Sequence, residues 1–323
     1  MCDYSASTCN MTFQNVLAEV SFDGKIFLQE HINGCLENRP LKKIFFKGFV
    51  PMLCSRAIGN MSELEEISLD GVGLHYVQPF YRKLPNLKRV KISFNPLYLI
   101  RAYVFSEIKL DTLDLSYNMI KLLGIMVFQH TEVNVLDLSH NRLESISKMT
   151  FINAKISELH IENNRIMYLA DDVFREMDRI KKIYLNNNNI HHIQDYTFKN
   201  LGPIYLDLHG NDLLQINFLN GALLKHLDVS FNKISYLSLD NSTSIESMQV
   251  CPNPWHCQCL KEFWKYAENH NITIVDSSIQ YDTKPICIAA SLECVNNYAY
   301  DVVRDLYFKK FNYFLFLDGA RLP

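Results

Sequence analysis

Leucine and polar residues alternate in two nearly identical stretches of the chain, LDLSYN at Leu113–Asn118 and LDLSHN at Leu136–Asn141. Apolar residues at every second position are typical of a β-strand with one buried face, and the asparagine after each strand suits a turn. The second stretch begins 23 residues after the first. Two copies at a short, fixed spacing predict a repeated unit of one strand and one return segment.

The same pattern continues in both directions when the asparagine is taken as the register mark. Successive marks lie 21 to 24 residues apart, and the eleven registers cover residues 19–255. The three N-terminal registers keep the frame but carry another residue at the mark. The marks are Lys25, Phe49, Val72, Asn95, Asn118, Asn141, Asn164, Asn188, Asn211, Asn232 and Asn253.

This pattern resembles the leucine-rich repeat, L-x-x-L-x-L-x-x-N-x-L. The resemblance implies an α/β fold, a horseshoe-shaped solenoid whose strands form a parallel sheet on the concave face. We expect each asparagine to hydrogen-bond backbone groups of neighbouring repeats inside its turn. A phenylalanine ten residues after the mark predicts an aromatic spine under the convex side. The spine consists of Phe105, Phe128, Phe151, Phe174 and Phe198.

The nine cysteines lie near the two ends of the chain, and none lies between residues 55 and 250. A solenoid needs caps where its core would meet water, and disulfide-bonded caps require an oxidising compartment. We therefore predict a secreted, extracellular protein with disulfide-bonded N- and C-terminal caps. Four N-x-S/T sequons are candidate glycosylation sites, at Asn10, Asn60, Asn241 and Asn271.

The C-terminal segment NPWHCQC, residues 253–259, resembles the flanking module of extracellular leucine-rich-repeat proteins, which continues into a short helix over the last repeat. Leu260, Phe263 and Trp264 give this helix an apolar face. The resemblance implies two disulfides, Cys257–Cys287 and Cys259–Cys294. The two later cysteines are only seven residues apart, which leaves the pairing order open. Zinc binding by the four thiolates is the alternative, but the C-x-C spacing is tighter than in usual zinc sites.

At the N-terminus, Cys2 and Cys9 close a short loop and predict a hairpin cap, and Cys35 and Cys54 face the core of adjacent repeats and are expected to pair. Cys251 is then the odd cysteine. We predict it at the surface of the last strand, as the cysteine of an interchain disulfide in a dimer. The alternative is that Cys251 pairs with Cys257 or Cys259 and a later cysteine is left over.

The short C-x₆-C start, the 23-residue repeats and the N-P-W closure together resemble the secreted leucine-rich-repeat immune proteins of insects, especially mosquitoes. In that family, the segment YDVVRDLYFKKF would begin a helix after the cap. The resemblance implies four parts: an N-terminal cap (1–18), the solenoid (19–255), a cysteine-rich cap (256–299) and a helical tail (300–323). It also implies innate-immune recognition or scaffolding, with a second leucine-rich-repeat chain or a complement-like protein as partner. The alternative is the ectodomain of a membrane receptor or adhesion protein.

Composition and motifs exclude other classes of function. The net charge is −3, from 32 basic and 35 acidic residues, so nothing indicates binding to nucleic acid. No apolar run reaches the roughly 20 residues of a membrane span. No catalytic or phosphate-binding motif is present, and we predict a protein that is not an enzyme and needs no cofactor or metal.

The candidate binding residues lie in two columns that the strand alternation exposes on the concave face. Tyr184, flanked by His160 and Asp207 with His209 nearby, has the aromatic and polar composition of a protein-binding hot spot. Asp114, Asp137 and His160 are expected to be consecutive neighbours, with the aspartates solvated. The first column reads Ser21, Phe45, Ser68, Lys91, Asp114, Asp137, His160, Tyr184, Asp207, Asp228 and Gln249. The second includes Asp70, Ser93, Ser116, Ser139, Glu162, His209 and Ser230.

Overall fold

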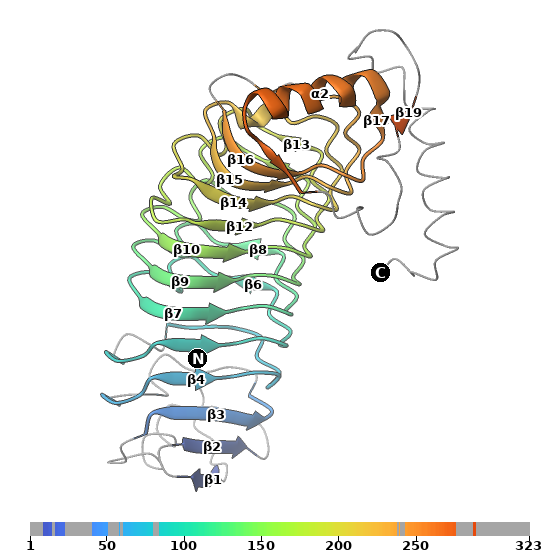
Figure 1. Cartoon of the computed structure of the whole chain (residues 1–323). Coiled ribbons are helices and arrows are strands. Elements are labelled where there is room, and N and C mark those ends of the chain that lie inside the picture. The colour runs from blue at the N-terminus through green and yellow to red at the C-terminus, as the bar shows by residue number, and fades with distance from the viewer. Residues whose placement is uncertain are drawn as a thin grey trace.

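The computed structural model describes residues 9–14, 17–22, 41–50, 58, 61–79, 84–237, 239, 243–275 and 287–288. Thirteen strands in these ranges form one long sheet, stacked along a curved solenoid (Figure 1). Every neighbouring pair from β2 onward is parallel, which confirms the predicted topology. The strands are β1 (Cys9–Gln14), β2 (Leu17–Phe22), β3 (Lys43–Gly48), β4 (Glu66–Ser68), β5 (Arg89–Lys91), β7 (Lys109–Asp114), β9 (Glu132–Asp137), β10 (Lys155–His160), β12 (Lys182–Tyr184), β14 (Ile204–Asp207), β15 (Leu223–Asp228), β16 (Ser244–Gln249) and β18 (Thr273–Ile274).

The core is a continuous column of aliphatic side chains, with Leu113 and Leu115 fully buried in one typical repeat. The predicted phenylalanine spine is confirmed: the five rings stack with centroids 5.7 to 6.3 Å apart. Phe218 extends it by one edge-on contact at 5.9 Å, which the sequence pattern did not predict. Because the rings are spaced more widely than the roughly 4.8 Å between strands, the solenoid curves with the sheet on its concave side.

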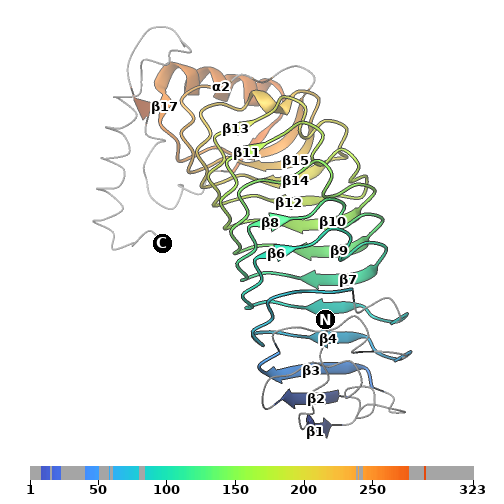
Figure 2. The same cartoon turned by 180° about the vertical axis from the view of Figure 1, so that it is seen from behind.

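In the repeats that the structure describes, the convex side is built from turns rather than helices, so the parallel-sheet solenoid is a β-solenoid and not the α/β form that we expected. Within the described residues, α2 (Cys257–Asn269) is the one α-helix, accompanied by a 3₁₀ turn at Asn217–Leu219. Short strand pairs cover part of the back instead (Figure 2), β6 (Leu99–Ile100) with β8 (Leu122–Leu123) and β11 (Tyr168–Leu169) with β13 (His192–Ile193).

The register asparagines form the predicted buried ladder. Asn141 donates to the carbonyl oxygens of Leu115, Leu138 and Ser139 at 2.9 to 3.1 Å, and its own side-chain oxygen accepts from the backbone N–H of Ile120 at 3.0 Å. One side chain therefore connects two repeats. The same arrangement recurs at Asn118, Asn164, Asn188, Asn211 and Asn232.

The first strands depart from the predicted register. β1 and β2 form an antiparallel hairpin, and β2 then pairs with β3 so that Glu19 lies opposite Phe45. Ser21 lies opposite Lys47 and is therefore two residues away from the predicted column. A shift by two keeps every side chain on its own face of the sheet, so hydrophobic alternation without an asparagine mark could not fix this register.

Helix α2 closes the C-terminal end of the core. Leu260, Phe263 and Ala267 are buried on one side of the helix, and the Phe263 ring lies parallel to that of Trp255 at 6.2 Å. Cys257 and Cys259, in its first turn, are both disulfide-bonded. The strand β17 (Trp255–His256) pairs with β19 (Cys287–Ile288). No helix among the described residues is long and apolar enough to cross a membrane.

Several predicted features lie outside the described part of the chain. These are the positions of Cys2, Cys35, Cys54 and Cys294, the side chains of Cys9, Asn10 and Cys287, the sequons at Asn60 and Asn241, and the helical tail 300–323. The pairings proposed for these cysteines therefore stay predictions. The fourth sequon asparagine, Asn271, is exposed directly after α2.

Candidate binding surface

The sheet register brings the predicted concave residues into one column. Asp114, Asp137, His160, Tyr184 and Asp207 are direct partners on consecutive strands from β7 to β14. Asp228 and Gln249 extend this column onto β15 and β16. The adjacency predicted from the spacing of the repeats is thus present, and the binding role of these residues stays a prediction.

Four rings form a continuous run across β10, β12, β14 and β15. His160 stacks on Tyr184 with centroids 4.5 Å apart, Tyr184 is tilted against Tyr205 at 5.6 Å, and Tyr205 stacks on His226 at 4.8 Å. All four side chains are partly exposed. We call these residues, with Asp207, His209 and Asp228, the ring surface.

The sequence pattern missed Tyr205 and His226. Each lies two residues before an aspartate of the column, Asp207 and Asp228, and strand alternation places such residues on the same face. A third column read two positions upstream of the first would have found both.

His160 lies between two carboxylates. Its Nε2 is 3.0 Å from Glu158 and its Nδ1 is 3.2 Å from Glu162, while Lys182 pairs with Glu158 at 3.1 Å. Burial opposes protonation of His160, but the two carboxylates outweigh it and raise the pKa of the imidazole above its usual value. The pKa of Tyr184 is also raised, first by burial and then by the charge of Glu158.

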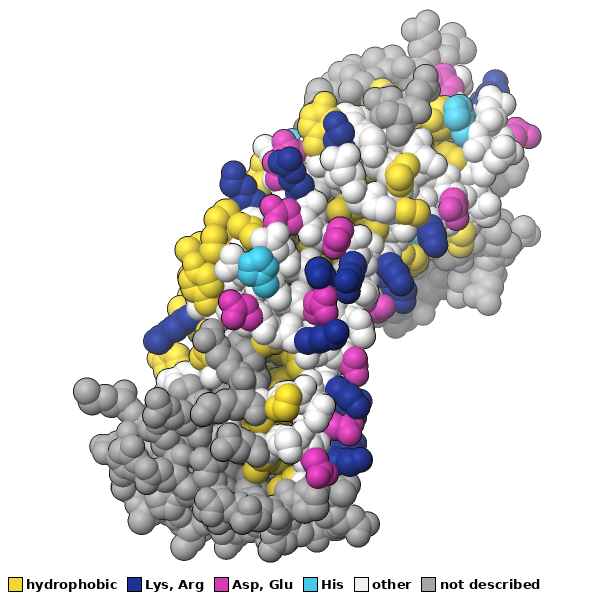
Figure 3. Space-filling model, turned by 90° about the vertical axis from the view of Figure 1, so that its left-hand side faces the viewer, with side chains coloured by type: hydrophobic (Ala, Val, Ile, Leu, Met, Phe, Trp, Pro, Cys, Tyr) yellow, Lys and Arg dark blue, Asp and Glu magenta, His cyan; other side chains and the backbone are white. Residues whose placement is uncertain are grey.

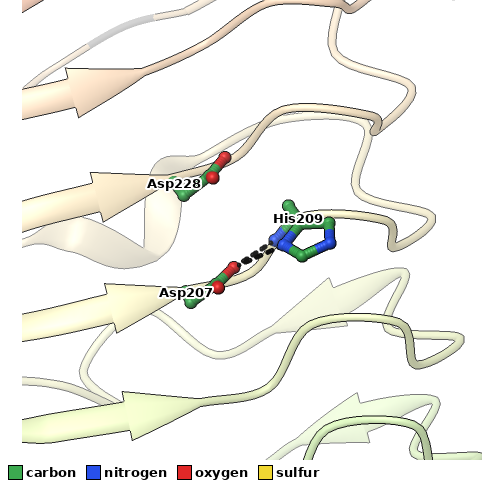
Figure 4. Close-up of side chains that lie close together, drawn as sticks. All are labelled: Asp207, His209 and Asp228. Carbon is green, nitrogen blue, oxygen red and sulfur yellow. Dashed lines mark hydrogen bonds and ion pairs between the residues drawn. The ribbon is translucent and has the colours of Figure 1, made fainter. Parts of the chain in front are cut away.

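Asp207, His209 and Asp228 cluster at the other end of the run (Figure 4). The Asp207 carboxylate accepts from the backbone N–H of His209 at 3.0 Å and lies 2.9 Å from its Nδ1. Asp228 accepts from the N–H and hydroxyl of Ser230 at 2.9 and 2.6 Å. The two aspartates are only 8% and 9% exposed, so the prediction that the strand aspartates are solvated is wrong here.

These three side chains each offer one ligand atom within 4.8 Å of the others, an arrangement that could hold a divalent cation. The hydrogen bonds from His209 and Ser230 already engage one oxygen of each carboxylate, so they explain the cluster without an ion. The hydrogen bond to Asp207 raises the pKa of His209. Burial raises the pKa of Asp228.

Burial shifts the pKa values of the two rings that border the cluster, Tyr205 and His226. Burial, followed by the charges of Asp207 and Asp228, raises the pKa of Tyr205 to about 12. Burial lowers the pKa of His226, although the two aspartates partly offset it. The two phenols of the ring surface are therefore neutral at physiological pH. Among its histidines, the pKa is raised at His160 and His209 and lowered at His226.

The serines of the second predicted column are buried, not exposed, whereas Asp70, Glu162 and His209 are partly exposed. Ser93, Ser116, Ser139 and Ser230 are at most 5% exposed. The N–H groups of Ser116, Ser139 and Ser230 donate to the strand aspartates, and the Ser93 hydroxyl donates to Asp70. Cys251 occupies the same repeat position and is 6% exposed. The predicted surface position of Cys251 is therefore wrong, and this burial argues against the interchain bond that we predicted from it.

Charges at the strand starts are paired across repeats. Glu132, which begins β9, contacts Lys109, Lys155 and Arg179 at 3.0 to 3.4 Å. Glu66 of β4 contacts Lys43 and Arg89 in the same way. Basic and acidic side chains accordingly alternate on the face shown in Figure 3, and no region of one sign dominates that face.

Residues 75–205 match the model of the BspA type leucine-rich repeat region, in six copies. No curated protein sequence matches the chain. The matched segment contains β5 to β13, the first two residues of β14 and all five spine phenylalanines.

Solved structures with a similar fold have low sequence identity. The mosquito LRIM1/APL1C complex is 19% identical with a TM-score of 0.61, over 87% of this chain and 51% of that chain. The LRIM1 leucine-rich repeat domain is 14% identical with a TM-score of 0.59, over 81% and 83%. The TLR13–ssRNA13 complex is 20% identical with a TM-score of 0.55, over 69% and 34%. The chain spans about half of the chain that it matches in the LRIM1/APL1C complex. The chain has a parallel β-solenoid fold, and its residues 75–205 match a leucine-rich-repeat model.

Proposed function

We propose that this chain is a secreted recognition or scaffold protein of innate immunity, which binds a protein partner through the ring surface. The run of four rings across adjacent strands is the observation that carries this proposal. Aromatic side chains dominate protein-binding hot spots because they bury a large area at a small entropic cost.

The sheet makes the ring surface a prepared binding site. Each ring contacts its neighbour, two of the three pairs by stacking, and the backbone beneath is held by ladder hydrogen bonds on both sides. Little side-chain freedom is left to be lost on binding, which favours affinity. The aspartates and histidines around the rings add hydrogen-bonding specificity for a polar protein surface.

The nature of the partner and the extracellular location rest on separate support. The LRIM1/APL1C structure is of a complex, which makes a second leucine-rich-repeat chain the first partner class to test, ahead of a complement-like protein. The disulfide bonds of Cys257 and Cys259 support secretion, since such bonds persist in oxidising compartments.

The test begins with crosslinking of the chain to its partner in native body fluid and identification of the partner by mass spectrometry. Affinity is then measured for Tyr184→Ala/Tyr205→Ala against the purified partner. We expect a loss of about 30-fold or more, corresponding to ~2 kcal/mol for a hot spot. Unchanged affinity would contradict the proposed surface.

Tyr196→Ala is the matched control, because Tyr196 is equally aromatic and 51% exposed but lies on the turn side of its repeat. Its affinity should equal that of the unmodified protein. Location is tested by expressing the full-length gene in cells. Recovery of the protein in the medium supports secretion, whereas retention at the cell surface would instead indicate a membrane receptor.

A further inference from the structure

Two neighbouring repeats expose large apolar side chains on one flank of the solenoid, where the chain leaves the sheet. The first contributes Phe94, Tyr98 and Leu99, and the second contributes Tyr117, Met119 and Leu122. Each of the six is between 36% and 57% exposed. We call them the flank patch.

The six side chains belong to two segments that run side by side. The rings of Phe94 and Tyr117 stack with centroids 4.5 Å apart. Further along, the N–H of Lys121 donates to the carbonyl of Tyr98 at 2.9 Å, and Leu99 pairs directly with Leu122 in the β6–β8 sheet. The exposed side chains of the two segments are therefore matched across the repeats at both ends of the patch.

Polar residues border the flank patch in the following repeat. The Tyr117 ring stacks on His140 at 4.1 Å, and beyond it come exposed Arg142 and the partly exposed Glu144. Glu144 pairs with Lys121 at 3.0 Å. An apolar centre with a polar rim of both signs is the anatomy of a protein interface.

The aromatic residues of the patch are held in an unfavourable backbone conformation. Phe94 and Tyr117 have φ angles of +56° and +51°, in the left-handed region that bulky residues rarely adopt. The same repeat position is glycine at Gly71 and Gly210 and asparagine at Asn163 and Asn187, which suit this conformation, but histidine at His140 and phenylalanine at Phe231. What distinguishes Phe94 and Tyr117 is that their two exposed rings, despite this backbone cost, stack on each other in adjacent repeats.

We propose that the flank patch is the contact surface of a symmetric homodimer, in which it faces the same patch of a second copy of this chain. Three aromatic and three aliphatic side chains at roughly half exposure present ~500 Å² of apolar surface. That is the apolar share expected of a contact of about 800 Å² per partner, the size of a stable specific interface.

The rim favours a second copy over an unrelated partner. A two-fold contact places one surface against itself, so a rim of a single sign would repel its own copy. Lys121 and Arg142 beside Glu144 give each copy both signs, so that basic and acidic groups can face each other across the axis. This dimer does not depend on the ring surface or its partner.

Analytical ultracentrifugation of the full chain over about a hundred-fold range of concentration tests the proposal. The unmodified protein should associate reversibly to a dimer. Tyr98→Asp/Leu122→Asp should weaken the dimer by about 100-fold or more, because it places desolvated charges opposite each other. Met167→Asp/Tyr168→Asp is the matched control. It adds the same charge at the corresponding repeat positions, on residues that are also exposed but lie outside the patch.

Phe94→Gly separates contact from folding. Glycine accepts the positive φ at this position, so the variant should keep its melting temperature while its dimer weakens about ten-fold. The proposal is overturned if the unmodified protein stays monomeric over the whole range. It is equally overturned if the control pair and the patch pair change the dimer constant alike.

Discussion

The asparagine ladder shows how one side chain can set the register of a whole repeat. The Asn141 amide satisfies three carbonyls and one N–H that belong to two repeats. Because these backbone groups lie beneath the sheet edge without access to water, each needs a partner. The role of the asparagine was predictable from sequence, since its spacing repeats. The positive φ of its preceding residue, such as Tyr117, was not, because tyrosine gives no sign of that conformation.

We expect Asn141→Ala to lower the free energy of unfolding by about 2–4 kcal/mol, because it leaves several buried backbone groups unpaired. Asn187→Ala should cost at most ~1 kcal/mol, since Asn187 is exposed and contributes mainly its tolerance of a φ of +54°. Chemical denaturation measures both. Equal losses in the two variants would contradict the ladder as the source of stability.

The three histidines of the ring surface should titrate in a fixed order. His160 and His209 have raised pKa values and His226 a lowered one, relative to an ordinary value of 6.5. NMR titration should therefore show the His226 ring deprotonating first as pH rises. Titration of His226 above the other two would contradict the environments described for them.

The same shifts fix the sign of the pH dependence of stability. The folded state holds the His160 proton more tightly than the unfolded state, so this contribution is fully present below pH 6.5 and is lost as pH rises through the folded pKa. His160→Gln should therefore flatten the decline of stability above pH 6.5. Glutamine can still form hydrogen bonds but cannot be protonated, so the substitution tests the effect of the charge. An unchanged pH profile in this variant would exclude His160 as its source.

At the scale of elements, strands were predictable and their surroundings were less so. Alternating leucines identified β7, β9 and β10, and the asparagine spacing aligned them. Alternation could not decide the register of β2, where a shift by two preserves the buried face. It also left the convex side open, because a ten-residue return segment with one buried phenylalanine suits either turns or a short helix.

Helix α2 should carry a large share of stability at the C-terminal end, because Phe263 fills the space above Trp255. Phe263→Ala should cost about 3–5 kcal/mol by leaving a cavity there. Lys261→Ala, on the exposed side of the same helix, should change stability by no more than ~0.5 kcal/mol. Thermal unfolding followed by circular dichroism compares the two, and similar melting temperatures would show that α2 does not seal the core.

At the scale of the whole molecule, a solenoid is stabilised repeat by repeat, so its surfaces are set locally. The ring surface was half predictable: the column containing Tyr184 followed from the repeat spacing, whereas Tyr205 and His226 required strand pairing. The burial of Ser116 and Cys251 was not foreseen, because side-chain exposure after a strand depends on how tightly the chain turns.

Stability should not be uniform along the solenoid. The repeats marked by Asn95 to Asn188 carry both the asparagine ladder and the phenylalanine spine. At the earlier marks, Phe49 is exposed and Val72 is buried without an amide, so neither can connect backbone groups of two repeats. Since each repeat contacts mainly its neighbours, a weak interface opens without unfolding the rest.

Native-state hydrogen exchange should therefore show the highest amide protection in β7 to β14 and lower protection in β3 and β4. An asparagine at position 49 could not form the buried ladder, because Phe49 is exposed. Val72→Asn places an asparagine at a register position that is buried. The Val72→Asn variant should show higher amide protection in β4 and β5 if the new side chain hydrogen-bonds the backbone. Protection should fall if the buried amide has no hydrogen-bond partner. Stronger protection in β3 and β4 than in β9 of the unmodified protein would show that the ladder and spine do not determine where the solenoid opens.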